Sequence, residues 1–154
     1  MDPVKKEVRE ELELCVRSFV EAVERSRQEG IDPFDELRIL EAAFNRLFLA
    51  VEHMCNALVL LETGNYSRKH FGNMKKLNEL AERYRVPLAE LYQTTYTFRS
   101  YADYRKYPEV ESTFNRGELK KQIAQVLPML ESCLEKACAG MPAADLSRHL
   151  KGSQ

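Results

Sequence analysis

The chain has 154 residues, of which 44% are hydrophobic and 31% are charged, and its formal net charge at pH 7 is −1. This length and composition suit one compact domain with a sizeable core and are too short to suggest two domains. The near-zero net charge provides no general attraction to polyphosphate or to an anionic membrane, so a nucleic-acid role would have to rest on a local basic patch.

The amino terminus, MDPVKKEVREELEL, is charged from its start and lacks the apolar core of a signal peptide. No later apolar run approaches the roughly 18 residues that a membrane span requires. We therefore expect a soluble, cytoplasmic protein that does not bind membranes.

Two helices are predicted in the first half of the chain. Apolar residues recur every three or four positions from Val4 to Val23, which predicts an amphipathic helix that ends near Gly30. After Pro33, apolar residues cover most of the helix circumference, as expected of a helix packed against several others. We expect this second helix to be the centre of the fold and to end at Gly64.

Three more helices are predicted in the second half. The third should direct toward the core the side chains of Phe71, Met74, Leu77, Leu80 and Tyr84. Pro87 separates it from a fourth helix, whose apolar stripe is Leu88, Leu91, Tyr92, Thr95, Phe98 and Ala102 and which Pro108 ends. Asn115 is a candidate N-cap for the fifth helix, whose stripe comprises Leu119, Ile123, Val126, Leu130, Leu134 and Cys138. Pro128 should kink this helix.

The pattern as a whole predicts an all-α fold. Five helices joined mostly by short loops favour antiparallel neighbours, so we expect an up-and-down helical bundle over residues 1–140. Residues 141–154 are expected to be a short C-terminal tail, either frayed or a single helical turn. We find no strand-period alternation, repeat or low-complexity tract.

The cysteines fall among residues at helical spacing, and none belongs to a CxxC pair. Such cysteines are typically small buried hydrophobes. A zinc site would need two or more close ligand pairs, and only the last two cysteines are near each other in sequence. We expect no metal, no disulfide and no cofactor. The four residues concerned are Cys15, Cys55, Cys133 and Cys138.

Three segments resemble the HEPN superfamily, and within it an archaeal and bacterial branch. The second predicted helix contains AAFNRLFLA and then ALVLLETG, residues 68–72 read RKHFG, and residues 99–104 read RSYADY. The order and spacing of these segments carry the resemblance, which covers roughly residues 37–134. It implies an all-α, HEPN-like bundle that commonly forms dimers and is often encoded beside a small nucleotidyltransferase.

Some HEPN proteins are metal-independent ribonucleases with an R-x(4–6)-H motif at the dimer interface. Here Arg99 occupies the arginine position, Ser100 follows it, and Tyr104 stands where the nearest allowed histidine would be. An arginine can stabilise charge on a phosphate. A tyrosine of ordinary pKa near 10 is only about one part in a thousand ionised at pH 7, and Asp103 is a weak base.

The missing motif histidine therefore favours a non-catalytic HEPN module that binds RNA, a nucleotide or a partner enzyme. The alternative is a ribonuclease toxin that uses Arg99, with Asp103 and Tyr104 as the other catalytic candidates. The four-residue spacing of Arg99 and Asp103 fits an exposed ion pair on a helix. It fits equally a partly buried polar cluster with Tyr104 at a dimer seam.

Basic residues outnumber acidic ones between Arg68 and Arg85. The usual explanation of such a run is a solvated helix face. The alternative, which would give it a function, is contact with the phosphates of RNA or a nucleotide. If residues 105 and 106 fold back alongside this run, it would join the Arg99 region. The candidate phosphate ligands are Arg68, Lys69, His70, Lys75 and Arg99.

The segment YTFRSYADY predicts an interface on the fourth helix, because tyrosine and arginine are enriched at protein interfaces. Together with the resemblance it predicts a homodimer, or a hetero-oligomer with a nucleotidyltransferase-type partner. In some HEPN pairs the partner adenylylates a tyrosine near the motif, which makes Tyr104 the first candidate acceptor and Tyr107 the second.

Arg46 and His53 also satisfy R-x6-H and lie on one face of the second helix. They are on the wrong helix for the family motif. A histidine in a largely buried helix is most often a hydrogen-bonded core or interface residue, and we interpret His53 in this way.

Overall fold

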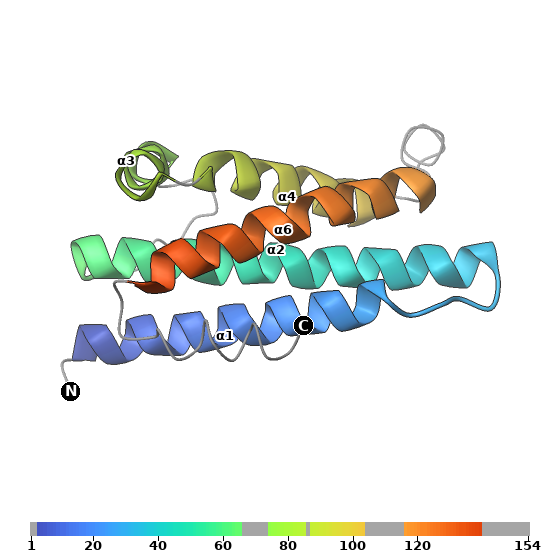
Figure 1. Ribbon diagram of the computed structural model, residues 1–154, viewed down its shortest axis with the longest axis horizontal. Helices are drawn as coiled ribbons and strands as arrows, with labels where there is room; N and C mark the ends of the chain where they lie inside the picture. Colours follow the sequence, from blue (N-terminus) through green and yellow to red (C-terminus); the bar gives the residue numbers. More distant parts are fainter. Residues whose placement is uncertain (1–2, 66–73, 86, 104–115, 140–154) are drawn as a thin grey trace.

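A computed structural model of the chain describes residues 3–65, 74–85, 87–103 and 116–139. These ranges contain α1 (Pro3–Ser26), α2 (Pro33–Thr63), α3 (Met74–Tyr84), α4 (Leu88–Asp103) and α6 (Arg116–Ala139), and no strand (Figure 1). The prediction of an all-α fold is confirmed. The predicted tail, residues 141–154, lies outside the described ranges, as do Phe71, Pro108 and the N-cap candidate Asn115.

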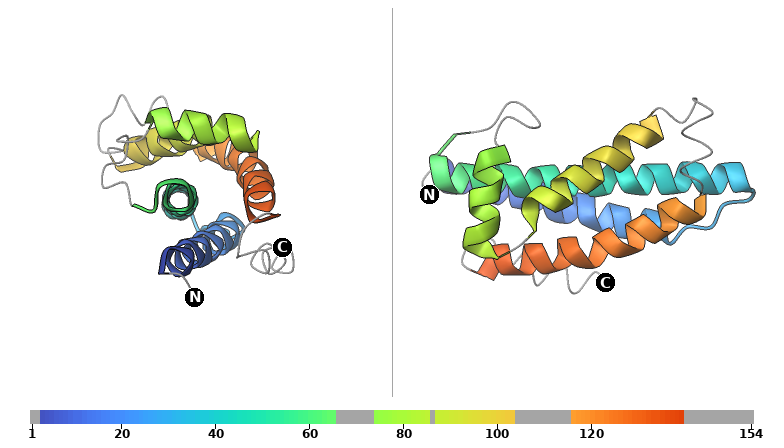
Figure 2. Two further views of the ribbon diagram at one scale, coloured as in Figure 1. Left: turned by 90° about the vertical axis from the view of Figure 1, so that its left-hand side faces the viewer. Right: turned by 90° about the horizontal axis from the view of Figure 1, so that it is seen from above.

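The long helices α1, α2, α4 and α6 alternate in direction, as in an up-and-down bundle (Figure 1). The short helix α3 lies across one end of this bundle (Figure 2). An ion pair between Arg83 and Glu62 joins α3 to the last turn of α2, and Lys136 of α6 donates a hydrogen bond to the Arg85 carbonyl at 3.4 Å. The described part of the bundle therefore consists of four long helices, with the short helix α3 packed across one end.

Local signals fix both ends of α2. At its start, the Asp32 side chain accepts a hydrogen bond from the Asp35 backbone N–H at 2.7 Å, and Pro33 occupies the first turn. At its end, Gly64 adopts a left-handed φ of 75° and donates its N–H to Leu60 at 2.8 Å. Helix α1 ends at Ser26, four residues before the predicted position at Gly30.

The turn between α1 and α2 is tight. A Cβ atom on Gly30 would lie 2.5 Å from the backbone nitrogen of Glu36 and 2.7 Å from its Cα. Real Cβ atoms do not approach backbone so closely, so the chain can pass this point only with a glycine. The turn thereby brings the C-terminal end of α1 against the first turn of α2.

Helix α2 is the centre of the core, as predicted. Its buried side chains belong to the same core clusters as those of α1, α4 and α6, which pack against it on three sides (Figure 2). The largest fully buried side chains of α2 are Phe44, Leu47, Phe48, Met54, Leu58 and Leu60. In the other helices the predicted inward residues Leu77, Leu80, Leu88, Leu91, Tyr92, Thr95, Ile123, Val126 and Leu130 are also buried. Helix α6 continues through Pro128 without a break.

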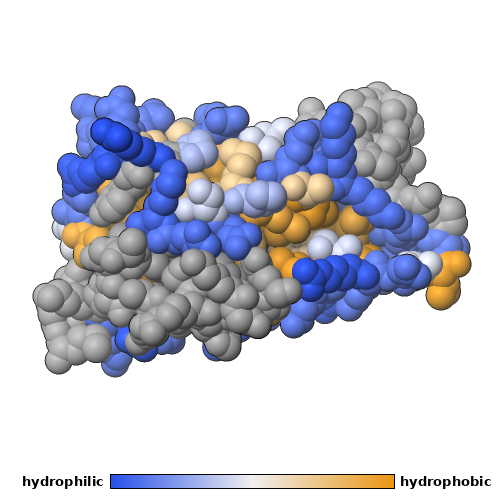
Figure 3. Space-filling view, in the orientation of Figure 1, coloured by the Kyte–Doolittle hydropathy of each residue, from blue (hydrophilic) through white to orange (hydrophobic). Residues whose placement is uncertain are grey.

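The sequence-based expectation about membrane spans needs correction. In the described part of the chain, the segment Arg38–Thr63 of α2 is long and apolar enough to cross a membrane. However, 61% of its most apolar window is buried inside the bundle. On the face shown in Figure 3, hydrophilic side chains cover much of the outer helices and hydrophobic atoms show between them. A helix at the centre of a soluble bundle must also be apolar around most of its circumference, because neighbouring helices cover it.

Candidate functional site

Arg99 lies on α4 at the edge of the surface that packs on α2. The buried residues Leu88, Leu91, Tyr92 and Thr95 face the core, and the half-buried Tyr96 and Arg99 continue this side of the helix toward its C-terminal end. Arg99 is thereby placed where its half-buried side chain lies against the core.

The guanidinium group of Arg99 rests on an aromatic cluster. Its Cζ atom lies 4.8 Å from the ring centroid of Phe48 on α2. The Phe48 ring is in turn 5.8 Å from the rings of Tyr92 and Tyr96, tilted by 55° and 59°. Cation–π contacts are worth about 0.5–2 kcal/mol and tilted ring pairs about 0.5–1.5 kcal/mol. The cluster therefore restricts where the planar guanidinium can lie.

Glu52 lies one turn beyond Phe48 on α2 and completes this cluster. The pKa of Tyr92 is raised well above its ordinary value, mainly by burial and then by the charges of Glu52, Cys55 and Tyr96, whereas Arg99 lowers it. The Tyr92 hydroxyl therefore stays protonated at neutral pH and can donate a hydrogen bond but cannot act as a base.

Several predicted site residues lie outside the described ranges, so their roles stay predictions. These are Arg68, Lys69, His70, Tyr104 and Tyr107. The structure describes the backbone of Asp103 but not its side chain. Lys75 is described and is exposed near the start of α3. Helix α3 crosses the end of the bundle at which α4 begins (Figure 2), whereas Arg99 lies eleven residues beyond Leu88, about 16 Å along the helix.

Sequence reasoning identified Arg99 but not the side chains that hold it. Phe48 belongs to the second predicted helix and is 51 positions away in the sequence, so no local pattern links the two residues. The spacing of Tyr92, Tyr96 and Arg99 by four and three residues was the available signal, because it places all three on one side of a helix.

A second polar cluster joins α2 to α1. Nδ1 of His53 is 2.7 Å from Oε2 of Glu11, and Nε of Arg46 is 3.2 Å from Oε2 of Glu21. The interpretation of His53 as a hydrogen-bonded residue between helices is confirmed. Arg46 and His53 are each held by a different carboxylate of α1.

Three of the four cysteines are confirmed as buried, unbridged residues: Cys15, Cys55 and Cys133. Burial is the main cause of a large upward shift in the pKa of Cys55, with Cys133 and Glu52 adding to it. Burial also raises the pKa of Cys133 to about 11, against the opposing effect of Lys136. Both thiols stay protonated at neutral pH and are poor nucleophiles and metal ligands. The described ranges contain no group of three or more metal-ligand side chains.

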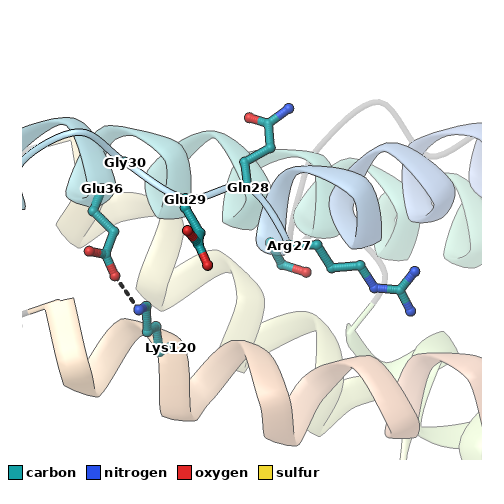
Figure 4. Close-up of a pocket in the computed structure, with 7 residues that line it drawn as sticks. Arg27, Gln28, Glu29, Gly30, Glu36 and Lys120 are labelled. Carbon is teal, nitrogen blue, oxygen red and sulfur yellow. Dashed lines mark ion pairs between the residues drawn. The ribbon is translucent and has the colours of Figure 1, made fainter.

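A polar cleft of about 360 Å³ lies at the turn between α1 and α2 (Figure 4). It is lined by Ser26, Arg27, Gln28, Glu29, Gly30, Glu36 and Lys120. Glu36 and Lys120 form an ion pair across it, and the side chain of Arg27 points away from that pair (Figure 4). The cleft holds two acidic and two basic side chains, so its own charge selects neither an anion nor a cation.

Comparison with protein-family models, curated proteins and solved structures finds no match to this chain. A function for the protein therefore has to be argued from its own residues and their geometry.

Proposed function

We propose that the protein is a non-catalytic HEPN-like module that binds an anionic group of RNA or a nucleotide through Arg99. The observation that supports this is the position of the guanidinium on the Phe48 ring at the edge of the bundle. Arginine presents a planar set of N–H donors that matches phosphate oxygens, and an aromatic platform reduces the freedom lost on binding.

The absence of cleavage is inferred from proton chemistry. Arginine cannot act as a base at neutral pH, and the raised pKa of Tyr92 removes that hydroxyl from consideration. The described histidine, His53, is held by Glu11 on the side of α2 that faces α1, whereas Arg99 belongs to the side that faces α4. Among the described residues the arrangement thus supplies a cation for recognition, with no histidine beside it.

The partners are part of the same proposal. The half-buried Tyr96 and Arg99 belong to the residue types that dominate protein interfaces. We propose a cytoplasmic homodimer, or a complex with a nucleotidyltransferase-type protein, that uses the C-terminal half of α4. Light scattering that gives a mass near 17.9 kDa at high concentration, with no co-purifying partner, would contradict this part of the proposal.

The first experiment measures binding and cleavage separately. Wild-type protein, Arg99→Ala and Arg99→Lys are incubated with labelled RNA of mixed sequence in the presence of EDTA. Fluorescence anisotropy should show salt-dependent binding by the wild type that Arg99→Ala weakens about tenfold, a loss within the range of one charge-assisted hydrogen-bonded contact. Gel analysis should show intact RNA.

A matched control is Arg38→Ala, which removes an exposed arginine from the first half of α2 and should leave RNA binding unchanged. Arg99→Lys should bind more weakly than wild type, because lysine keeps the charge but loses the planar fork. Cleavage by the wild type that disappears in Arg99→Ala would overturn the non-catalytic proposal and favour the ribonuclease alternative.

A further inference from the structure

The pair formed by Glu11 and His53 fixes the orientation and the tautomer of the histidine ring. Glu11 lies on α1 and is only 8% exposed, and its Oε2 is 2.7 Å from Nδ1 of His53. An ionised carboxylate can only accept hydrogen bonds, so Nδ1 must carry the proton. The lone pair of the neutral ring therefore resides on Nε2.

The His53 side chain is partly accessible from solvent. It is 24% exposed, and the described residues make no hydrogen bond to its Nε2. Leu49 and Asn56, one turn before and one turn after His53, are half-buried and lie on the same side of α2. Viewed along the bundle, α1, α4 and α6 leave one side of α2 uncovered by any described helix (Figure 2). A reactant can therefore approach the ring across a helix face.

We propose that Nε2 of His53 accepts a phosphoryl group from an acyl phosphate. The Nε2 lone pair attacks phosphorus, the N–P bond forms, and the P–O bond to the acyl group breaks as the carboxylate leaves with its electron pair. Nδ1 keeps its proton, so the ring becomes positively charged. The reaction needs no further reactant and releases no proton.

Glu11 is the group that makes this step favourable. Its carboxylate, in direct contact with the Nδ1 proton, offsets the positive charge that develops on the ring, as the aspartate of a Ser-His-Asp triad does for its histidine. Asn56, half-buried on the next turn of α2, carries side-chain N–H groups of the kind that can donate to phosphoryl oxygens. This site is independent of Arg99, so it goes beyond the proposed function and does not depend on it.

The test compares the three histidines of the full-length chain, which are His53, His70 and His149. Wild-type protein is incubated with acetyl phosphate and, in a parallel reaction, with phosphoramidate. Phosphohistidine is then located by peptide mass spectrometry under alkaline conditions, in which it is stable. We expect His53 to be phosphorylated about tenfold faster than His70 or His149, because the Glu11 carboxylate offsets the charge that its ring acquires.

Two matched variants isolate the contribution of Glu11. Glu11→Gln retains a hydrogen-bond acceptor but removes the negative charge, and should slow phosphorylation of His53 about tenfold or more. Glu21→Gln removes a charge from the other ion pair between α1 and α2 and should leave the rate unchanged. Circular dichroism checks that both variants fold.

Equal phosphorylation of all three histidines would overturn the proposal, as would equal slowing in the two variants. If Glu11→Gln does not fold, the ranking of the three histidines in the wild-type chain decides the question alone.

Discussion

The two flanks of α2 are held by different kinds of contact. Toward α1, two carboxylates reach across to His53 and Arg46 at the margin of a buried layer of apolar side chains. Toward α4, the contact is aromatic, with Phe48 packed against Tyr92, Tyr96 and the Arg99 guanidinium. The first flank adds ion pairs and hydrogen bonding to its packed layer, whereas the second adds aromatic contacts to its own. The two should therefore respond differently to substitution and to pH.

Substitution of Phe48 should produce the largest effect. Phe48→Ala removes a fully buried ring and should lower the free energy of unfolding by about 3–5 kcal/mol. It should also weaken RNA binding, because Arg99 loses its platform. Urea denaturation measures the first effect and fluorescence anisotropy the second. Phe48→Leu is the control for volume, and equal RNA binding by Phe48→Leu and wild type would show that the ring does not position Arg99.

The two carboxylates on the other flank should differ in their contribution. Glu11→Ala removes a nearly buried acceptor and should cost about 1.5–3 kcal/mol, the usual range for a hydrogen bond to a charged group. Glu21→Ala breaks an ion pair whose side chains are 40% and 44% exposed, and such pairs contribute only about 0–1 kcal/mol. Urea denaturation of the two variants should rank them in this order. Equal losses would mean that burial does not distinguish the two pairs.

The pH dependence of stability should report on the side of α2 that faces α4 and α6, where the groups with raised pKa values lie. Burial raises the pKa of Tyr92 and Cys55, and it raises that of Cys133 from the ordinary 9.0 to about 11. A group whose pKa is raised by folding contributes stability below its unfolded pKa and loses it as pH rises through the folded value. The urea midpoint should therefore fall between pH 9.0 and about 11.

Tyr92→Phe should reduce this alkaline loss, because the substitution removes one of the titrating groups. Glu11→Gln, on the flank toward α1, should lose as much stability as wild type over the same pH interval. An unchanged alkaline loss in Tyr92→Phe would show that this hydroxyl does not contribute to the pH dependence.

Most of the fold could be predicted because helical periodicity is a local property. The stripes that include Leu88, Leu91 and Tyr92 on one helix and Ile123, Val126 and Leu130 on another were readable within single segments, and the structure buries them. The candidate site could be predicted only in part, since its partners come from different helices. Glu11 and His53 are 42 residues apart, and nothing within either segment indicates that they meet.

The close approach at Gly30 sets more than the shape of a turn. Glu11 precedes Gly30 by 19 residues, which at the helical rise of 1.5 Å per residue corresponds to about 28 Å. A small change in the direction of α1 at the turn therefore becomes a much larger displacement of Glu11. A side chain at position 30 would push the two helices apart at the Glu36 backbone and alter the angle between them. Because the helix pair is long, the close approach at Gly30 helps to determine whether Glu11 and His53 meet, far from the turn.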